Sequence, residues 1–162
     1  MRLIMKRIAF SVLTAVSIIA IIAHWRNRLP SPERMTRPPG YEWFTVQRNE
    51  YHSRPWLTNL HLVPAFVYAI TVPFQFSTTM RAKHLNAHRM IGRFLLATMP
   101  IIALTGLIMG WVMPYGGLLE TISASILFFL VLAATIKGYS AIRHHDIKNH
   151  RAWMIRLFAW CM

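Results

Sequence analysis

Two short motifs, each containing a histidine followed by an arginine, are the residues of this chain best suited to binding chemistry. They read Asn86-Ala87-His88-Arg89-Met90-Ile91-Gly92-Arg93 and Asn149-His150-Arg151-Ala152-Trp153-Met154-Ile155-Arg156. Each stands at the start of an apolar run, so the two histidines are expected at the mouths of two membrane helices. Neutral imidazole ligates haem iron and other metals. The motifs therefore predict a binding site at one end of a helix bundle.

A b-type haem held between His88 and His150 is the leading hypothesis, because haem in helical bundles is ligated by histidines from two facing helices. These two histidines are the predicted metal ligands, and His145 is the alternative partner. Arginine presents a planar fork of donors that suits a carboxylate. The arginines expected to pair with the haem propionates are Arg89, Arg93, Arg151 and Arg156.

Other functions explain the same residues. A non-catalytic role in lipid binding or membrane-complex assembly accounts for a basic membrane face equally well and is the alternative to haem binding. A metal site built from His84, His88, His144, His145, Asp146 and His150 is disfavoured because the neighbouring arginines repel a cation. Proton-coupled transport usually requires acids within the helices, and only Glu120 approaches that position. The motifs of hydrolases and zinc proteases do not occur, and whether the protein is an enzyme stays open.

Long apolar runs place the chain among polytopic all-α membrane proteins. About 20 apolar residues cross the hydrocarbon layer as a helix, and charge-free runs without alternation favour helices over a barrel. We predict four complete spans and a partial fifth that is too short to cross. The complete spans are 8–23, 56–76, 94–113 and 118–136, and the partial one is 153–162.

The partial fifth helix is expected to pack against the spans at 94–113 and 118–136 or to be covered by a partner, since its last carbonyls would otherwise face lipid. Gly106 and Gly110 form a small-x-x-x-small surface that allows close helix packing, within the bundle or with a membrane-protein partner. The order of the spans also suggests a parallel repeat of two helical hairpins, which would put His88 and His150 in matching places.

The distribution of cations predicts a multi-pass protein of the inner (plasma) membrane with a cytoplasmic N-terminus. The chain carries 18 Lys and Arg against 5 Asp and Glu. Six of these cations lie between His24 and Pro55, and the others fall in segments that this orientation places inside, as the positive-inside rule requires. Membrane lipids are thus expected contacts. Nucleic acid is excluded as a partner, because no basic soluble module with interleaved aromatics is present.

Three segments organise the chain. Residues 1–24 are predicted to form an N-terminal membrane anchor, because no small-x-small cleavage site follows the apolar run. Residues 25–55 form an external proline-rich loop, and residues 56–162 form the helical membrane bundle. The single cysteine, Cys161, excludes a disulfide within the chain.

A polar stripe lies on the predicted span 56–76. His61 is followed at helical spacing by Tyr68, Thr71 and Gln75, so this face is expected to contact protein rather than lipid. An intramembrane histidine is a functional candidate, although no histidine of the next two spans lies at its level. His61, Tyr68 and Gln75 are therefore retained as candidate site residues.

These motifs resemble a family of bacterial multi-span membrane proteins of unassigned function, a domain-of-unknown-function family. The resemblance rests on Leu60-His61, on Pro73-Phe74-Gln75, on His-Arg-x-x-Gly-Arg at 88–93 and on His-Arg-x-Trp-Met-Ile-Arg at 150–156. It covers residues 56–160 and implies membership rather than an activity. Members of the family continue through a complete fifth helix, so this chain is expected to be truncated at its C-terminus.

Overall fold

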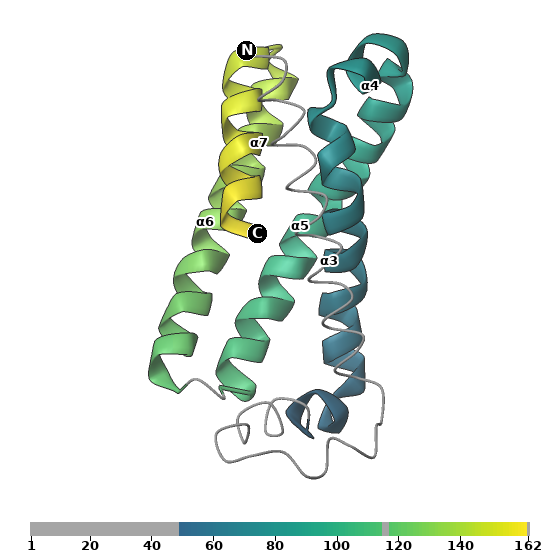
Figure 1. Cartoon of the computed structure of the whole chain (residues 1–162). Helices are drawn as coiled ribbons and strands as arrows, with labels where there is room; N and C mark the ends of the chain where they lie inside the picture. Colours follow the sequence, from purple (N-terminus) through teal and green to yellow (C-terminus); the bar gives the residue numbers. More distant parts are fainter. Residues whose placement is uncertain (1–48, 115–116, 162) are drawn as a thin grey trace, which may run out of the picture.

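The computed structural model describes residues 49–114 and 117–161, which form helices joined by short connections. The helices are α3 (Pro55–Phe76), α4 (Thr78–Lys83), α5 (Leu85–Val112), α6 (Leu118–Arg143) and α7 (Ile147–Cys161) (Figure 1). Residues 49–53 are also helical, and the described part of the chain contains no strand. The prediction of an all-α protein is confirmed.

Three helices, α3, α5 and α6, are long and apolar enough to cross a membrane. Their outward surfaces carry large apolar side chains such as Phe129 and Leu119, which are 67% and 78% exposed. Apolar surface on this scale suits lipid rather than water. The predicted first span at 8–23 and most of the loop at 25–55 lie outside the described residues. The 15 residues of α7 extend only about 22 Å, short of the hydrocarbon thickness.

The helices begin and end further out than the apolar runs predicted. α5 begins at Leu85 rather than Phe94, α6 continues to Arg143 rather than Ile136, and α7 begins at Ile147 rather than Trp153. A hydropathy boundary marks where charge starts, whereas helical hydrogen bonding continues past the hydrocarbon because water there solvates charged side chains. Both histidine motifs therefore lie inside the first turns of their helices.

The asparagines of the two motifs, Asn86 and Asn149, do not occupy the N-cap positions of α5 and α7. His84 occupies the N-cap position of α5 without a side-chain hydrogen bond. At the start of α7, the Asp146 carboxylate accepts a hydrogen bond of 3.0 Å from the backbone N–H of Asn149. Aspartate is a preferred N-cap residue, so Asp146 ends the turn and begins α7.

The turn before α7 closes α6 with a Schellman motif. His145 has a left-handed backbone with φ of 60°, and its N–H donates to the carbonyl of Ile142 at 3.2 Å. The next N–H, of Asp146, donates to the carbonyl of Ala141 at 2.9 Å. This pair of bonds satisfies two carbonyls at the helix end. The turn sends α7 back along α6.

The capping carboxylate gives α7 a predictable pH dependence. Hydrogen bonds from the backbone and side chain of Asn149 hold the pKa of Asp146 below its ordinary value. The stabilisation is complete above the ordinary aspartate pKa of about 3.9 and is lost as pH falls through the lowered pKa.

We expect Asp146→Ala to speed amide exchange in the first turn of α7 severalfold at neutral pH. Hydrogen–deuterium exchange measures this, and Asp146→Asn, which retains a capping oxygen, should change it little. Equal acceleration by both variants would contradict the capping role.

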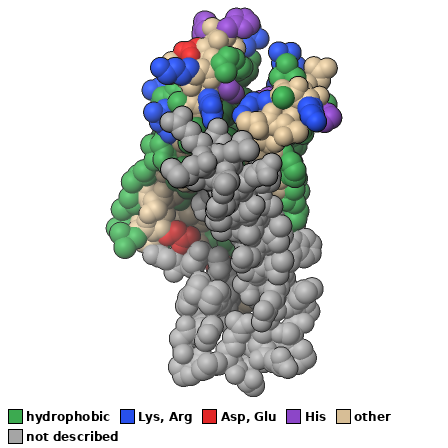
Figure 2. Space-filling model, turned by 45° about the horizontal axis from the view of Figure 1, so that its top comes forward, with side chains coloured by type: hydrophobic (Ala, Val, Ile, Leu, Met, Phe, Trp, Pro, Cys, Tyr) green, Lys and Arg blue, Asp and Glu red, His purple; other side chains and the backbone are tan. Residues whose placement is uncertain are grey.

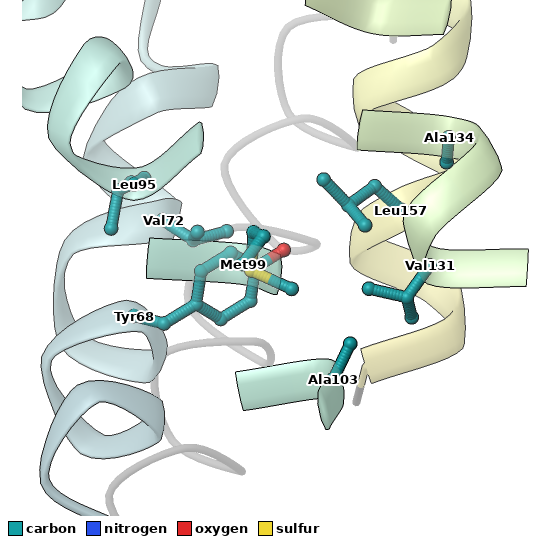
Figure 3. Packing of buried hydrophobic residues seen from close by; sticks show 8 residues of the cluster. All are labelled: Tyr68, Val72, Leu95, Met99, Ala103, Val131, Ala134 and Leu157. Carbon is teal, nitrogen blue, oxygen red and sulfur yellow. The ribbon is translucent and has the colours of Figure 1, made fainter. Parts of the chain in front are cut away.

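Helices α3, α5, α6 and α7 run alternately up and down, with α4 as a short helix between α3 and α5 (Figure 1). Each packs on its neighbour in sequence: α3 on α5, α5 on α6 and α6 on α7. One apolar cluster joins all four, made of Tyr68, Val72, Leu95, Met99, Ala103, Val131, Ala134 and Leu157 (Figure 3). A bundle core of this kind fixes the helices that carry the candidate site residues.

The short last helix is part of this core. Leu157 of α7 is 3% exposed and belongs to the cluster with Met99 of α5 and Val131 of α6. Phe158 also contacts Phe76 of α3, with ring centroids 5.5 Å apart. Within the described residues up to Cys161, α7 packs on α6 and reaches α5 through Leu157 in the shared cluster.

Gly106 and Gly110 are both used inside the bundle, on two different helices. A Cβ at Gly106 would lie 3.1 Å from Cε1 of His61 in α3, and a Cβ at Gly110 would lie 2.5 Å from Cβ of Ala124 in α6. The small-residue surface thus lets α5 approach α3 and α6 closely.

Candidate functional site

Basic and histidine side chains gather at the end of the bundle where α5 and α7 begin (Figure 2). His88 and His150 both lie at this end, in the first turns of α5 and α7. The acidic residue of α6, Glu120, lies in its first turn, at the opposite end. The geometry of this basic end decides what the two motifs can bind.

His88 faces the interior of the bundle. It lies on the same face of α5 as Leu95 and Met99, which belong to the core. Its Nδ1 atom is buried and has no hydrogen-bond partner among the described residues. Buried polar atoms are almost always paired, so an orphaned ring nitrogen requires an explanation.

His150 is held in one orientation by the backbone of α6. Its Nδ1 lies 2.8 Å from the carbonyl oxygen of Gly138. A carbonyl can only accept, so Nδ1 carries a proton, and in the neutral ring Nε2 then has the free lone pair. A ligating histidine usually donates its other ring N–H to a carbonyl or carboxylate in this manner. His150 is therefore arranged as a ligand would be.

Gly138 lies where α7 packs closely on α6, beside the residues that follow His150. A Cβ at Gly138 would overlap the Met154 side chain and lie 3.5 Å from Cβ of Trp153. The overlapping atom is the flexible end of Met154, and the distance to Trp153 is an ordinary van der Waals contact, so Gly138 gives the Met154 side chain room beside α6. The sequence gives a weak signal of this role, a glycine between Lys137 and Tyr139, and the motif-based reasoning did not use it.

His88 of α5 and His150 of α7 each lie in the first turn of their helix, at the same end of the bundle. They come from helices that do not follow one another in the chain. The structure thus places at one end of the bundle the two histidines that the repeated motifs indicated.

Gln75 joins His88 at the basic end, from the last turn of α3. Its Nε2 is the second buried side-chain atom without a partner in the described part of the chain. Its Oε1 lies beside Gly92, where an added Cβ would be 3.4 Å away, and Gly92 is one turn from His88. The backbone carbonyl of Gln75 accepts a hydrogen bond of 3.1 Å from Arg81. Two unpaired nitrogens and a guanidinium therefore converge from α3, α4 and α5.

The four arginines proposed for propionates lie in different surroundings. Arg89 and Arg93 line a shallow hollow with Asn86 and Met90 on the outer side of α5. The guanidinium of Arg156 lies 4.6 Å from the ring centroid of Trp153, and the ammonium of Lys137 lies 4.8 Å from the same centroid. Arg151 is exposed. Arg81, which the motif-based reasoning did not select, is the arginine that contacts the Gln75 backbone beside His88.

The remaining histidines at this end are exposed. His84 ends α4, and His144 and His145 form the turn after α6. Within residues 49–114 and 117–161, no three His, Cys, Asp or Glu side chains are grouped to hold a metal ion. The six-residue metal site considered from the sequence is thus not assembled in the described residues.

His61 belongs to a separate polar contact between α3 and α5. Its Nδ1 lies 3.0 Å from the carbonyl of Ile102 and 3.0 Å from Oγ1 of Thr105. Thr105 donates its own proton to the carbonyl of Ile101 at 2.7 Å, so the ring N–H is shared by both acceptors. His61 therefore joins two helices through a satisfied hydrogen bond. Thr105, the neighbour of Gly106, was not identified from the sequence.

Tyr68 is buried and belongs to the core cluster, against which Cys161 of α7 packs. The expectation that the stripe carrying His61, Tyr68 and Gln75 faces protein is consistent with these contacts. The three residues do not share one site, because each contacts a different part of the bundle.

Comparison with known proteins places the chain in a family. The family model described as "Predicted membrane protein (DUF2306)" matches residues 58–162, more than half of the chain. The chain belongs to this family. The match includes both histidine motifs of this DUF2306 protein and the helices that position them. No match was found among curated proteins or among solved structures.

Proposed function

We propose that this DUF2306 protein binds a b-type haem between His88 of α5 and His150 of α7, at the basic end of the bundle. The observation that carries the proposal is the buried, unpartnered Nδ1 of His88, because burial without a partner costs free energy that a bound group can recover. His150 supports it with a free Nε2 and an anchored Nδ1–H. His145 is a weaker second ligand because it is exposed and lies in the turn.

The residues around the histidine pair fit the polar part of such a ligand. Arg81 lies beside His88 and Gln75, and guanidinium groups pair with carboxylates such as propionates. The buried Nε2 of Gln75 is a further donor without a partner. On the apolar side, Leu95 and Met99 follow His88 along the same face. A haem bound there supplies one-electron transfer, with the axial ligands and their hydrogen bonds setting its potential.

The first test is the cofactor content of the full chain. Protein expressed with haem available and purified in mild detergent should show a reduced-minus-oxidised spectrum of b-type haem. The haem-to-protein ratio should approach one, since one histidine pair holds one iron. A colourless protein under these conditions would contradict the proposal.

We further propose that the chain has four complete spans and a partial fifth, with its N-terminus in the cytoplasm of a bacterial inner membrane. The distribution of cations supports this orientation. The start of α5 and the start of α7 at one end of the bundle support a repeat of two hairpins.

Reporter fusions test the orientation. A fusion after Phe76, before the basic residues of α4, should report a cytoplasmic location. A fusion within residues 27–55 should report an external one. Activity of a cytoplasmic reporter at 27–55, together with an external reading after Phe76, would place the histidine site on the outer side instead.

A further inference from the structure

The outer side of α5 carries a group of residues that the haem proposal does not use. We propose that Asn86, Arg89 and Arg93 bind the phosphate of an anionic phospholipid, with an acyl chain lying along Met90 and Phe94. The site is separate from the histidine pair, so the two proposals succeed or fail independently.

Helical spacing puts these residues on one face. Asn86, Arg89, Met90 and Arg93 follow at steps of three and four residues, which are neighbours on a helix surface, and together they line one shallow hollow. Arg89 and Arg93 lie about 100° and 140° around the helix from His88, at about 100° per residue. His88 thus faces the bundle while the hollow faces outward.

The two guanidinium groups need an anion from elsewhere. Both arginines are exposed, and neither has an ion-pair partner among residues 49–114 and 117–161. The acids of these ranges are occupied or distant: Glu50 pairs with Arg54, Asp146 caps α7 and Glu120 is in the first turn of α6. Arginine binds phosphate through two parallel hydrogen bonds. A phosphate satisfies both the charge and the donors of this hollow.

The position along α5 corresponds to the headgroup layer. The helix has 28 residues, about 42 Å, whereas the hydrocarbon layer is about 30 Å thick. Its first turns therefore extend beyond the hydrocarbon, where arginine side chains reach phosphates. Met90 lies between the two arginines along α5, and Phe94 and Ile101 follow towards the hydrocarbon; these side chains are 68%, 53% and 42% exposed.

This apolar continuation favours a lipid over free phosphate. A free phosphate would use only the three polar residues, whereas a phospholipid also covers the exposed side chains of Met90 and Phe94. A zwitterionic headgroup brings its own ammonium next to two arginines, which weakens binding. An anionic headgroup such as phosphatidylglycerol carries no such cation.

Native mass spectrometry of the delipidated full chain tests the site. Titration with phosphatidylglycerol should give one tightly bound lipid per chain. The variant Arg89→Gln/Arg93→Gln should bind it roughly 25-fold more weakly, because each cation near anionic lipid contributes about a factor of five. The matched control, Arg143→Gln/Arg151→Gln, removes two exposed arginines from the same end of α6 and α7 and should leave that binding unchanged.

Three outcomes would overturn the proposal. In the first, phosphatidylcholine binds the unaltered chain as tightly as phosphatidylglycerol, which would show that the site does not select an anionic headgroup. The control variant could lose as much affinity as the Arg89/Arg93 variant, which would indicate nonspecific attraction. Glycerol phosphate at the same concentration could displace the lipid, which would assign the hollow to a free phosphate. The haem content of the Arg89/Arg93 variant and of the control variant should be equal, which would show that the change in lipid binding does not arise from the histidine site.

Discussion

Replacing His88 with alanine is expected to reduce the bound haem of the purified protein by more than tenfold, and His150→Ala should do the same. Each change removes one axial ligand, and outer-shell changes alone commonly cost metal sites ten- to a hundredfold in affinity. His88→Ala also removes a partly buried ring whose buried Nδ1 has no partner in the described residues. The variant should therefore fold at least as well as the unaltered chain, so the loss would concern the cofactor. The measurement is haem per chain from the reduced-minus-oxidised spectrum.

The matched controls are histidines of the same end that are exposed. His84→Ala and His144→Ala should retain the full haem content. His145→Ala distinguishes the alternative ligand, and it too should retain haem if His150 is the axial residue. Full retention in His150→Ala together with loss in His145→Ala would move the second ligand to the turn. Loss in every variant, controls included, would indicate that the change in charge or fold is responsible.

Replacing Gly110 with alanine should lower the free energy of unfolding by about 2 kcal/mol. The new Cβ would lie 2.5 Å from Cβ of Ala124, and because both atoms are fixed to helix backbones, α5 and α6 must separate. Overpacking of this kind costs about 1–3 kcal/mol, here near the upper end, while alanine regains at most about 1 kcal/mol in helix propensity. The separation would also strain the hydrogen bond of 2.8 Å from Thr121 to the carbonyl of Gly110. Equilibrium unfolding in detergent measures the loss.

A reciprocal change provides the control for this prediction. Ala124→Gly in the Gly110→Ala background moves the methyl group from α6 to α5 and should restore most of the lost stability. Ala97→Val, a small-to-large change on the exposed side of α5, should have little effect. Failure of the double variant to recover would show that the cost does not arise from the contact between these two positions.

The helices themselves could be predicted because charge-free runs in a lipid environment have few alternatives to helix. The ends of the helices could not be predicted in this way. An apolar run stops at the first charged residue, whereas the backbone hydrogen bonds of the helix continue beyond it. Lys137 illustrates this: it ends the apolar run of α6, yet its ammonium lies over the ring of Trp153 in α7 and the helix continues past it. The start of α7 depends on the carboxylate of Asp146, a single side chain outside any apolar run.

The site was predictable to a similar degree. The repeated motifs indicated His88 and His150 as a pair, because each stands at the start of an apolar run and the two runs start at the same side of the membrane. Which side of the helix each residue faces depends on contacts between distant segments, such as His150 with Gly138 or His61 with Thr105. Arg81 and Gly138 were not identified for this reason: neither lies in a motif, and each acquires its role only through a neighbouring helix.

Electron paramagnetic resonance of the oxidised, unaltered protein tests most directly whether His88 and His150 share one iron. Two imidazole ligands should give a low-spin ferric signal, at about one iron per chain. His88→Ala and His150→Ala should each abolish that signal, and His84→Ala should leave it unchanged. A high-spin signal with a single histidine ligand, or a protein that carries no iron when haem is supplied, would contradict the account.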